Sequence, residues 1–273
     1  GQTSHGFVGN PNFFGSYLVL LNGLAFAAFC FIQCRLFRWF FYLATLLFTM
    51  LSTYSNTTSS WIGMFFIVIL LSLLILIYRS QAQTSDQKVC FNQALKRLVI
   101  ATISSLSMFL LINFLENWKY MRGLITISTD ALNLLQQQQL QNQMGSGRGF
   151  IWKTCLALLP EYWLHGCGPD TLSVFNLTFP TNPNMIIDKA HNEFLQIAVT
   201  QGIPALLAYL SFLYFVVRCA LTNFAKSHSS KNDWINYALL AAFFGYLVQS
   251  FFNISVVTVA PYFWLICGLI CFS

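Results

Sequence analysis

The stretch WIGMFFIVILLSLLILIY, Trp61–Tyr78, decides the fold class, because it contains no Asp, Glu, Lys, Arg or His. A helix needs roughly 20 apolar residues to cross the roughly 30 Å of bilayer hydrocarbon, and this run comes close to that length. The whole chain has the same character. Of its 273 residues 56% are hydrophobic and 8% are charged, against about 25% charged residues in a typical soluble domain. The sequence therefore predicts a membrane protein.

Apolar runs of this kind follow one another along the chain, near residues 13–34, 39–56, 61–78, 98–115, 194–217, 235–256 and 257–273. None of them contains a charged residue or a histidine, each of which would cost about 2.5 to 3.5 kcal/mol at the centre of a membrane helix. We therefore predict an all-α fold, a polytopic bundle with about seven transmembrane helices. Seven is a minimum, because the chain begins at Gly1 rather than at methionine and no signal-peptide pattern precedes the first run.

The net charge of +6 indicates membrane orientation rather than nucleic-acid binding. If Arg35 and Arg38 face the cytoplasm, alternation of the runs places nine of the fourteen basic residues and two of the eight acidic residues on that side. Such an excess of Lys and Arg is the positive-inside signal. A nucleic-acid site would instead need basic residues clustered on one folded surface with stacking aromatics. We expect no nucleic-acid partner.

The same alternation leaves one long extracytoplasmic segment between the fourth and fifth runs. Loops of this length are usually functional or disordered. We therefore divide the chain into spans one to four (1–115), a large, partly helical exterior loop that carries the site (116–190) and spans five to seven (191–273). Within the loop, the glutamines at 136–139 predict a solvated helix or a mobile stretch. In the fifth span, Gly202 and Pro204 predict a kink, which is either ordinary or shapes a cavity.

The acidic and cysteine residues predict no metal site. The exterior acids form no D-x-D pair, and the chain has no H-E-x-x-H motif. The eight cysteines include no C-x-x-C pair or zinc-type spacing. We therefore expect no metal.

The first candidate for chemistry is His191, in the segment DKAHNEFLQ, Asp188–Gln196. Asp188 is a good N-cap for a helix that begins at Lys189, and His191 would then lie in the first turn. The positive end of the helix dipole disfavours the imidazolium there, so the ring would stay neutral and serve as a general base. Asp188 could orient the ring from the same helix face. The alternative is an interfacial histidine that only satisfies a polar helix end.

The second candidate is Arg148, in SGRGFIWKTCLALLP, a predicted short helix that Pro160 ends. A cation at a helix start opposes the helix dipole. A phosphate would resolve this conflict, because it can accept hydrogen bonds from the guanidinium and from the free N–H groups of the first turn. Trp152, one turn along, could hold an apolar tail or stack on a sugar ring. The alternative is an arginine that extends to the lipid headgroups.

Other residues of the exterior loop are predicted to bind the same substrate. Lys153, Arg122 and Lys189 are weaker cationic candidates of the same kind as Arg148. Gly166 and Gly168 form a tight turn, which is not a dinucleotide fingerprint, because Thr171 stands where the third glycine would be.

Five segments, taken together, carry a family resemblance: GFVGNPNFFGSYL (6–18), SGRGFIWK (146–153), HGCGPDTL (165–172), DKAHNEFLQIAVTQGIPALLAYL (188–210) and QSFFNISVVTVAPYFWLICGLI (249–270). In this combination the sequence resembles the bacterial O-antigen ligase and O-antigen polymerase-like membrane family. The resemblance covers nearly the whole chain and is strongest from residue 146 onward.

The resemblance implies a multi-pass glycosyltransferase of the bacterial cytoplasmic membrane. Its donor would be a glycan on undecaprenyl diphosphate, its acceptor a hydroxyl of a glycan or lipid on the extracytoplasmic face, and it would use no nucleotide sugar, metal or other cofactor. Polysaccharide assembly proteins would be its protein partners. Relatives usually have further spans before the NPN segment, so the resemblance also implies a chain that is incomplete at its N-terminus.

The resemblance also implies roles for single residues. Relatives carry an arginine in an R-x-x-x-W segment and a histidine at the start of the following span, which match Arg148 and His191 here. Many also carry an arginine at the start of the third span, where this chain has Thr58. If that arginine binds diphosphate, Arg122 or Lys189 would take over the contact in this protein.

Two functions of other classes stay open. Some relatives are proposed to transport small anions such as bicarbonate. Transporters place substrate groups near the membrane midplane, often on broken helices, and only the Gly202–Pro204 break suggests this here. The other is a non-catalytic component of a polysaccharide assembly complex, which would bind glycan without turning it over.

Overall fold

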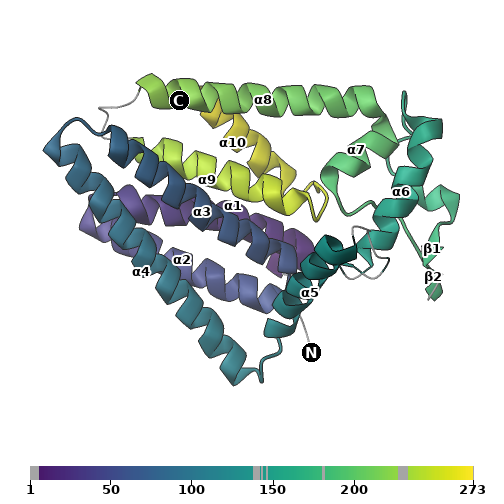
Figure 1. Cartoon of the computed structure of the whole chain (residues 1–273), viewed down its shortest axis with the longest axis horizontal. Coiled ribbons are helices and arrows are strands. Elements are labelled where there is room, and N and C mark those ends of the chain that lie inside the picture. The colour runs from purple at the N-terminus through teal and green to yellow at the C-terminus, as the bar shows by residue number, and fades with distance from the viewer. Residues whose placement is uncertain are drawn as a thin grey trace. The chain divides into compact units, whose positions relative to one another are not determined.

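The computed structural model of the chain is built mainly of α-helices (Figure 1) and describes residues 6–137, 142, 144, 145, 147–179, 182–226 and 233–272. The ten α-helices of this part are α1 (Pro11–Phe31), α2 (Arg35–Ser55), α3 (Thr58–Gln81), α4 (Ser85–Leu115), α5 (Met121–Gln137), α6 (Arg148–Tyr162), α7 (Glu193–Gln201), α8 (Ile203–Lys226), α9 (Asp233–Ser250) and α10 (Ala260–Phe272). The prediction of an all-α fold is confirmed. Gln138 and Gln139 of the predicted glutamine stretch lie outside the described residues, as does Lys231, one of the nine basic residues assigned to the cytoplasmic side.

The remaining elements are short. Two 3-10 helices, η1 (Gly6–Val8) and η2 (Leu172–Phe175), accompany two antiparallel strands, β1 (Thr178–Phe179) and β2 (Asn182–Ile186). Thr178 is paired with Ile186 and Phe179 with Asn182, so the register shifts between the two pairs. The sequence analysis did not predict this hairpin.

Five helices are long and apolar enough to cross a membrane: Pro11–Phe31, Arg35–Ser55, Thr58–Gln81, Ser85–Leu115 and Ile203–Asn223. They correspond to the first five predicted runs, so the protein is a multi-pass helical membrane protein. The last two predicted runs correspond to α9, of 18 residues, and α10, of 13 residues. The boundary predicted between 256 and 257 is wrong, because residues 251–259 between the two helices are not helical. The count of seven spans stays a prediction, since α10 is shorter than the roughly 20 residues that a crossing helix needs.

Side-chain caps explain where two of these helices begin. Asn10 accepts a hydrogen bond from the N–H of Asn12 at 2.8 Å, and Pro11, which lacks an N–H, occupies the first helical position of α1. Before α4, Thr84 and Gln87 form a reciprocal capping box. The cap explains why α4 begins well before the apolar run predicted at 98–115.

The fifth predicted span, 194–217, is two helices rather than one kinked helix. Helix α7 ends at Gln201, and Gly202 adopts φ of 92° and ψ of 165° before α8 begins at Ile203. Only glycine adopts this conformation readily. Pro204 is the second residue of α8, where a missing N–H breaks no helical hydrogen bond. The predicted proline kink is therefore wrong, because the chain breaks at the glycine and the proline lies in a first turn.

The chain forms two compact units. The first comprises Gly1–Met121, Val216–Gln249 and Val256–Ser273, and the second comprises Arg122–Phe215 and Ser250–Ser255. The first unit therefore contains α1 to α4, α9 and α10. The second contains most of the predicted exterior loop, together with α7 and the first half of α8.

Helix α1 is the central element of the first unit. Of its apolar window 78% is buried, compared with 22–33% for α2, α3 and α4. Glycines allow the helices to approach closely: a Cβ atom on Gly23 of α1 would lie 2.7 Å from the backbone of Ala242 in α9, and one on Gly63 of α3 would lie 3.0 Å from the carbonyl oxygen of Gly245. Small residues play this part at membrane helix contacts, where backbone packing replaces the hydrophobic effect.

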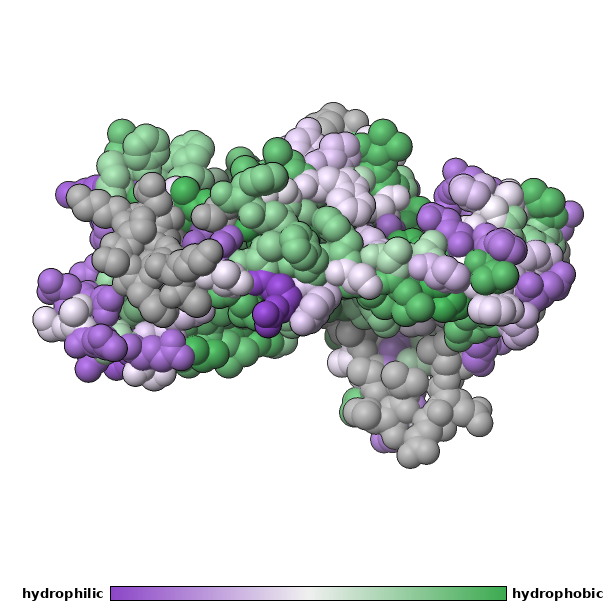
Figure 2. Space-filling view, turned by 90° about the horizontal axis from the view of Figure 1, so that it is seen from above, coloured by the Kyte–Doolittle hydropathy of each residue, from purple (hydrophilic) through white to green (hydrophobic). Residues whose placement is uncertain are grey.

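The outer helices of this unit carry large apolar side chains on their exposed faces, among them Phe40, Leu43, Phe65, Leu73, Leu106 and Phe114. Figure 2 shows hydrophobic residues covering continuous areas of the face that it presents. In water such a surface would cause association or aggregation. On a membrane span it is the surface that contacts lipid.

We expect Gly23→Ala to destabilise the first unit, because the added methyl group would meet backbone atoms that cannot move aside. Overpacking of this kind lowers the free energy of unfolding by about 1 to 3 kcal/mol. Thermal unfolding of the purified protein in detergent measures the effect. The matched control is Gly268→Ala in α10, where nothing lies within 4 Å of the new Cβ. Equal unfolding midpoints for the two variants would contradict the close approach of α1 and α9.

Candidate functional site

The second unit has its own small core, formed by the buried residues Ile151, Cys155, Leu172, Ile187, Ala190 and Val199. These residues come from α6, η2, the end of the hairpin and α7. Pro160 lies inside α6, which continues to Tyr162, so the prediction that Pro160 ends the helix is wrong by two residues. The core fixes α6 and α7 against the extended segment 187–192.

Ala190 is the most constrained residue of that segment. Its side chain is fully buried, and its N–H donates to Oε1 of Gln196 at 2.7 Å. Its carbonyl accepts a hydrogen bond from Nε1 of Trp152 at 3.1 Å. Trp152 is in turn packed on the rings of Phe251 and Phe252, with centroids 5.8 and 6.3 Å away. Hydrogen bonds of both its N–H and its carbonyl therefore fix Ala190, the residue directly before His191.

His191 follows in the left-handed region, with φ of 49°, which non-glycine residues adopt at a cost in energy. The predicted local structure is wrong here. Asn192, not Asp188, is the N-cap, because its side chain accepts a hydrogen bond from the N–H of Leu195 at 3.0 Å, and the helix begins at Glu193. His191 therefore lies just before the helix rather than in its first turn.

Arg148 is the first residue of α6, as predicted, and follows Gly147, which has φ of 93°. The prediction of free N–H groups in this turn is wrong. The N–H groups of Arg148, Gly149 and Phe150 donate within the chain, to the carbonyls of Gly145, Met144 and Asn142 respectively. An anion at this position would therefore be bound by the guanidinium and not by the helix end.

The guanidinium of Arg148 is half-buried, and within the described part of the chain it has neither a hydrogen bond nor an ion pair. Burial lowers the pKa of Arg148, but the side chain stays charged at neutral pH, because arginine starts from a pKa above 12. A buried charge without a partner is unfavourable unless something else compensates for it. The described residues therefore leave the charge of Arg148 uncompensated.

Arg148 and His191 interact electrostatically, although they are far apart in the sequence. The pKa of His191 is lowered, first by burial and then by the positive charge of Arg148, while the negative charge of Asp188 opposes the shift. The ring is therefore neutral at pH 7, as predicted, but for a different reason than the helix dipole. Its Nδ1 atom is buried and forms no hydrogen bond with any residue that the structure describes.

The glycine turn packs against the end of α7. The N–H groups of Cys167 and Gly168 donate to the carbonyls of Val199 and Thr200, at 2.8 and 2.9 Å. Gly166 has φ of 70°, and a Cβ atom on it would lie 2.2 Å from the backbone of Thr200. The turn satisfies carbonyls that the end of α7 would otherwise leave unpaired. Its observed contacts are structural, and substrate binding by Gly166 and Gly168 stays a prediction.

The other predicted binding residues occupy different surroundings. Lys189 forms an ion pair with Asp170. Asp188 is exposed, and Arg122 is exposed in the first turn of α5. Thr58 begins α3, in the first unit. Among the predicted site residues, the structure therefore brings together Arg148, Trp152 and His191, with Asp188 close enough to affect the imidazole electrostatically.

Glu193 makes a structural contact that its place in the sequence did not predict. Its carboxylate accepts a hydrogen bond from the N–H of Ser255, and burial raises its pKa, which the hydrogen bonds from Ser255 partly oppose. The contact ties the start of α7 to the segment 250–255, which also supplies the two phenylalanines beneath Trp152. The only signal in the sequence was an acidic residue directly after the His-Asn pair, which is common at any helix start.

These observations define a class: a polytopic helical membrane protein in which a guanidinium without a counter-ion among the described residues acts electrostatically on a neutral imidazole, both outside the candidate spans. The O-antigen ligase family pattern matches residues 41–210, more than half of the chain and a range that includes Arg148 and His191. The chain belongs to the O-antigen ligase family. Membership implies a ligase or glycosyltransferase activity on lipid-linked glycans. The comparison with curated proteins gives no match.

We expect nuclear magnetic resonance titration to give His191 a pKa below the ordinary 6.5, and Arg148→Met to raise it. Methionine keeps apolar bulk at position 148 and removes the charge that opposes protonation of the ring. His191→Gln identifies the resonance. Lys153→Met, which removes an exposed charge from the same helix, is the control and should leave the titration unchanged. Identical titrations in the wild type and Arg148→Met would show that the two groups do not interact.

Proposed function

We propose that this protein transfers an oligosaccharide or polysaccharide from undecaprenyl diphosphate to an acceptor hydroxyl. The observation that carries the proposal is the guanidinium of Arg148, which has no counter-ion among the described residues and acts electrostatically on a neutral His191. Such a cation is a site for an anion, and a diphosphate supplies one. Membership of the O-antigen ligase family supports a lipid-linked glycan as the donor.

Arg148 would stabilise the leaving group. As the bond between the anomeric carbon and the phosphate oxygen breaks, the diphosphate keeps the electron pair and gains negative charge. A guanidinium offers two parallel N–H donors to phosphate oxygens, and its half-buried position strengthens the interaction. Because this charge belongs to the protein, the proposed transfer is independent of a metal ion.

His191 would act as the general base. A sugar hydroxyl is scarcely ionised near pH 7, so its attack on the anomeric carbon needs a group that takes the proton as the new C–O bond forms. A neutral imidazole can accept that proton. The geometry of the base would come from Trp152 and Gln196, which hold the backbone of Ala190 directly before it.

The remaining predicted residues would have supporting parts. Arg122 and Lys189 would contact the diphosphate, and Lys189 would do so by exchanging Asp170 for phosphate. Asp188 would stabilise the imidazolium once it forms, because its charge raises the pKa of the ring. Gly166 and Gly168 would border the glycan. Polysaccharide assembly proteins would supply the donor and receive the product.

The proposed location is the bacterial cytoplasmic membrane, with the segment 116–190 on the extracytoplasmic face. The excess of Lys and Arg on the opposite side of the predicted spans supports this orientation. In this arrangement α9 and α10 would complete a set of seven membrane segments.

We expect the purified protein to transfer a labelled glycan from undecaprenyl diphosphate to an acceptor, and both His191→Ala and Arg148→Ala to lose about a hundredfold or more of the rate. Losses of this size follow from removing a general base or an electrostatic stabiliser of the leaving group. Lys153→Ala, on the same helix as Arg148, is the matched control and should keep the wild-type rate, because the Lys153 ammonium is exposed and donates to Oδ1 of Asn142 at 3.1 Å. Normal transfer by both site variants would refute the roles given to these residues.

The other functional classes predict different results in the same preparation. A small-anion transporter would show substrate flux in reconstituted vesicles and no glycan product. A non-catalytic assembly component would bind glycan stoichiometrically without turnover, and binding would survive His191→Ala. Either pattern would replace the proposal.

The pH dependence of the transfer provides a separate prediction. The base must be deprotonated, so kcat/KM should fall as the pH drops through the pKa of His191 in the free enzyme. Because burial and Arg148 hold that pKa below 6.5, the half-maximal kcat/KM should lie below pH 6.5. A profile whose half-maximum lies above pH 6.5 would exclude His191 as the base.

A further inference from the structure

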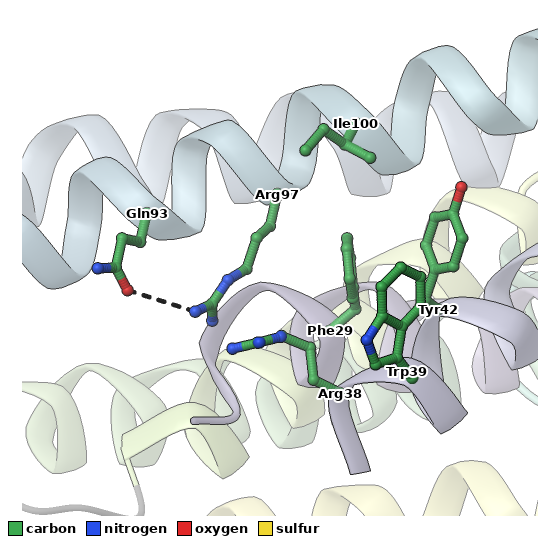
Figure 3. Close-up of a pocket in the computed structure, with 7 residues that line it drawn as sticks. All are labelled: Phe29, Arg38, Trp39, Tyr42, Gln93, Arg97 and Ile100. Carbon is green, nitrogen blue, oxygen red and sulfur yellow. Dashed lines mark hydrogen bonds between the residues drawn. The ribbon is translucent and has the colours of Figure 1, made fainter. Parts of the chain in front are cut away.

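A second arginine site lies within the first unit and shares no residue with the candidate site described above. The pocket has a volume of about 490 Å³ and is lined by the side chains that Figure 3 shows, Phe29, Arg38, Trp39, Tyr42, Gln93, Arg97 and Ile100. They come from the last turns of α1, the first turns of α2 and the first half of α4. Arg38 and Arg97 directly precede the predicted apolar runs 39–56 and 98–115, so the pocket lies at the edge of the hydrocarbon region.

Arg97 is fixed in place by neutral groups. Its Nη1 donates to the carbonyls of Cys30 and Ile32, at 2.9 and 3.2 Å, and its Nη2 donates to Oε1 of Gln93 at 3.3 Å (Figure 3). A guanidinium at the C-terminus of α1 satisfies carbonyls that the helix leaves unpaired, and it complements the negative end of the dipole. These partners orient the guanidinium, but none of them neutralises its full charge.

Arg38 adds a second positive charge in the same pocket. Its half-buried side chain points toward that of Arg97 in Figure 3, and the two charges act on one another. Neither guanidinium is in an ion pair within the ranges that the structure describes, and no acidic residue lines the pocket. Like charges held together without an acid favour the binding of an anion.

The opposite wall of the pocket is apolar and aromatic. Trp39 and Tyr42 pack edge to face with ring centroids 5.6 Å apart, and Tyr42 packs on Phe29 at 5.0 Å. The Tyr42 hydroxyl donates to Ser104 at 2.8 Å, which fixes the ring. Beside the pocket, Leu36, Phe37 and Phe40 of α2 are exposed. A ligand here would place a charged head beside the arginines and apolar chains along α2 and α4.

We propose that this pocket binds the phosphate group of an anionic phospholipid. Basic pockets between membrane helices recognise anionic headgroups, and tryptophan is the residue most typical of that depth. A membrane lipid accounts for both walls of the pocket, whereas free phosphate accounts only for the arginines. The pocket shares no residue with the site of Arg148 and His191, so the proposal does not rest on the proposed transfer reaction.

The experiment compares three probes by their effect on the thermal unfolding of the full chain in detergent: phosphatidylglycerol, phosphatidylcholine and inorganic phosphate. A ligand that binds the folded state raises the unfolding midpoint in proportion to the logarithm of its concentration over its Kd. Phosphatidylglycerol should raise the midpoint, and the other two should not. Arg38→Gln should weaken the affinity for phosphatidylglycerol about fivefold, which is the contribution of one basic residue near a membrane surface.

Arg35→Gln is the matched control, because Arg35 lies in the first turn of the same helix, is exposed and does not line the pocket. It should keep the wild-type response. Three results would overturn the proposal: an equal response to phosphatidylcholine, an equal response to inorganic phosphate that Arg38→Gln abolishes, or equal responses of the two variants to phosphatidylglycerol. The first would indicate unspecific lipid binding, the second a simple anion site, and the third a charge effect without a site.

Discussion

A bilayer offers no hydrogen-bond partner to a backbone N–H or carbonyl group, and this constraint governs the rest of the structure. It makes every candidate span a helix and excludes loops from the hydrocarbon region. It also explains why polar chemistry is concentrated elsewhere. The predicted runs contain no charged residue, so charged groups lie outside them, many in segment 116–193, most of which belongs to a unit with its own small core. Arg148 and His191 belong to that part of the chain.

The apolar runs could be predicted from sequence because hydrophobic length is a local property. Local signals failed where two residues offered the same cap. Asp188 and Asn192 are both good N-caps, and the choice between them depends on how Ala190 is held, with its N–H donating to Gln196 and its carbonyl accepting from Trp152. Similarly, Gly202 and Pro204 both interrupt a helix, and only the packing of Gly202 on Leu164 shows which one does. Contacts of this kind join residues far apart in the chain, and one sequence does not reveal them.

For the site, residue types and spacing identified Arg148, Trp152 and His191, and resemblance assigned their roles. The spacing of these residues in the sequence could not predict the electrostatic interaction between Arg148 and His191. The lowered pKa of His191 depends on burial and on a charge 43 positions earlier, counted from 191 back to 148. Glu193 illustrates the same limit, because its partner Ser255 is 62 positions away. The family pattern covers both Arg148 and His191 but leaves the chemistry of donor and acceptor to experiment.

The shortage of acidic residues links the two arginine sites. The chain has fourteen basic and eight acidic residues, and the described part contains a single ion pair, between Lys189 and Asp170. Within the described residues, Arg148, Arg38 and Arg97 are all partly buried and none has a carboxylate partner. In a soluble protein such groups would be unfavourable, but a membrane offers phosphate groups. Under the two proposals above, the protein would complete its charge balance with phosphates of membrane lipids.

The break at Gly202 has a mechanical consequence. Because α7 and α8 are separate helices, a rotation of α8 about its axis is not passed through a continuous hydrogen-bond ladder into α7. The N–H of Ile203 donates to the carbonyl of Trp163 at 2.7 Å, so the start of α8 is fastened to the turn that also closes α7. If α8 tilts, as in bilayers of different thickness, the backbone of Gly202 would change conformation, and α7 and His191 would keep their positions.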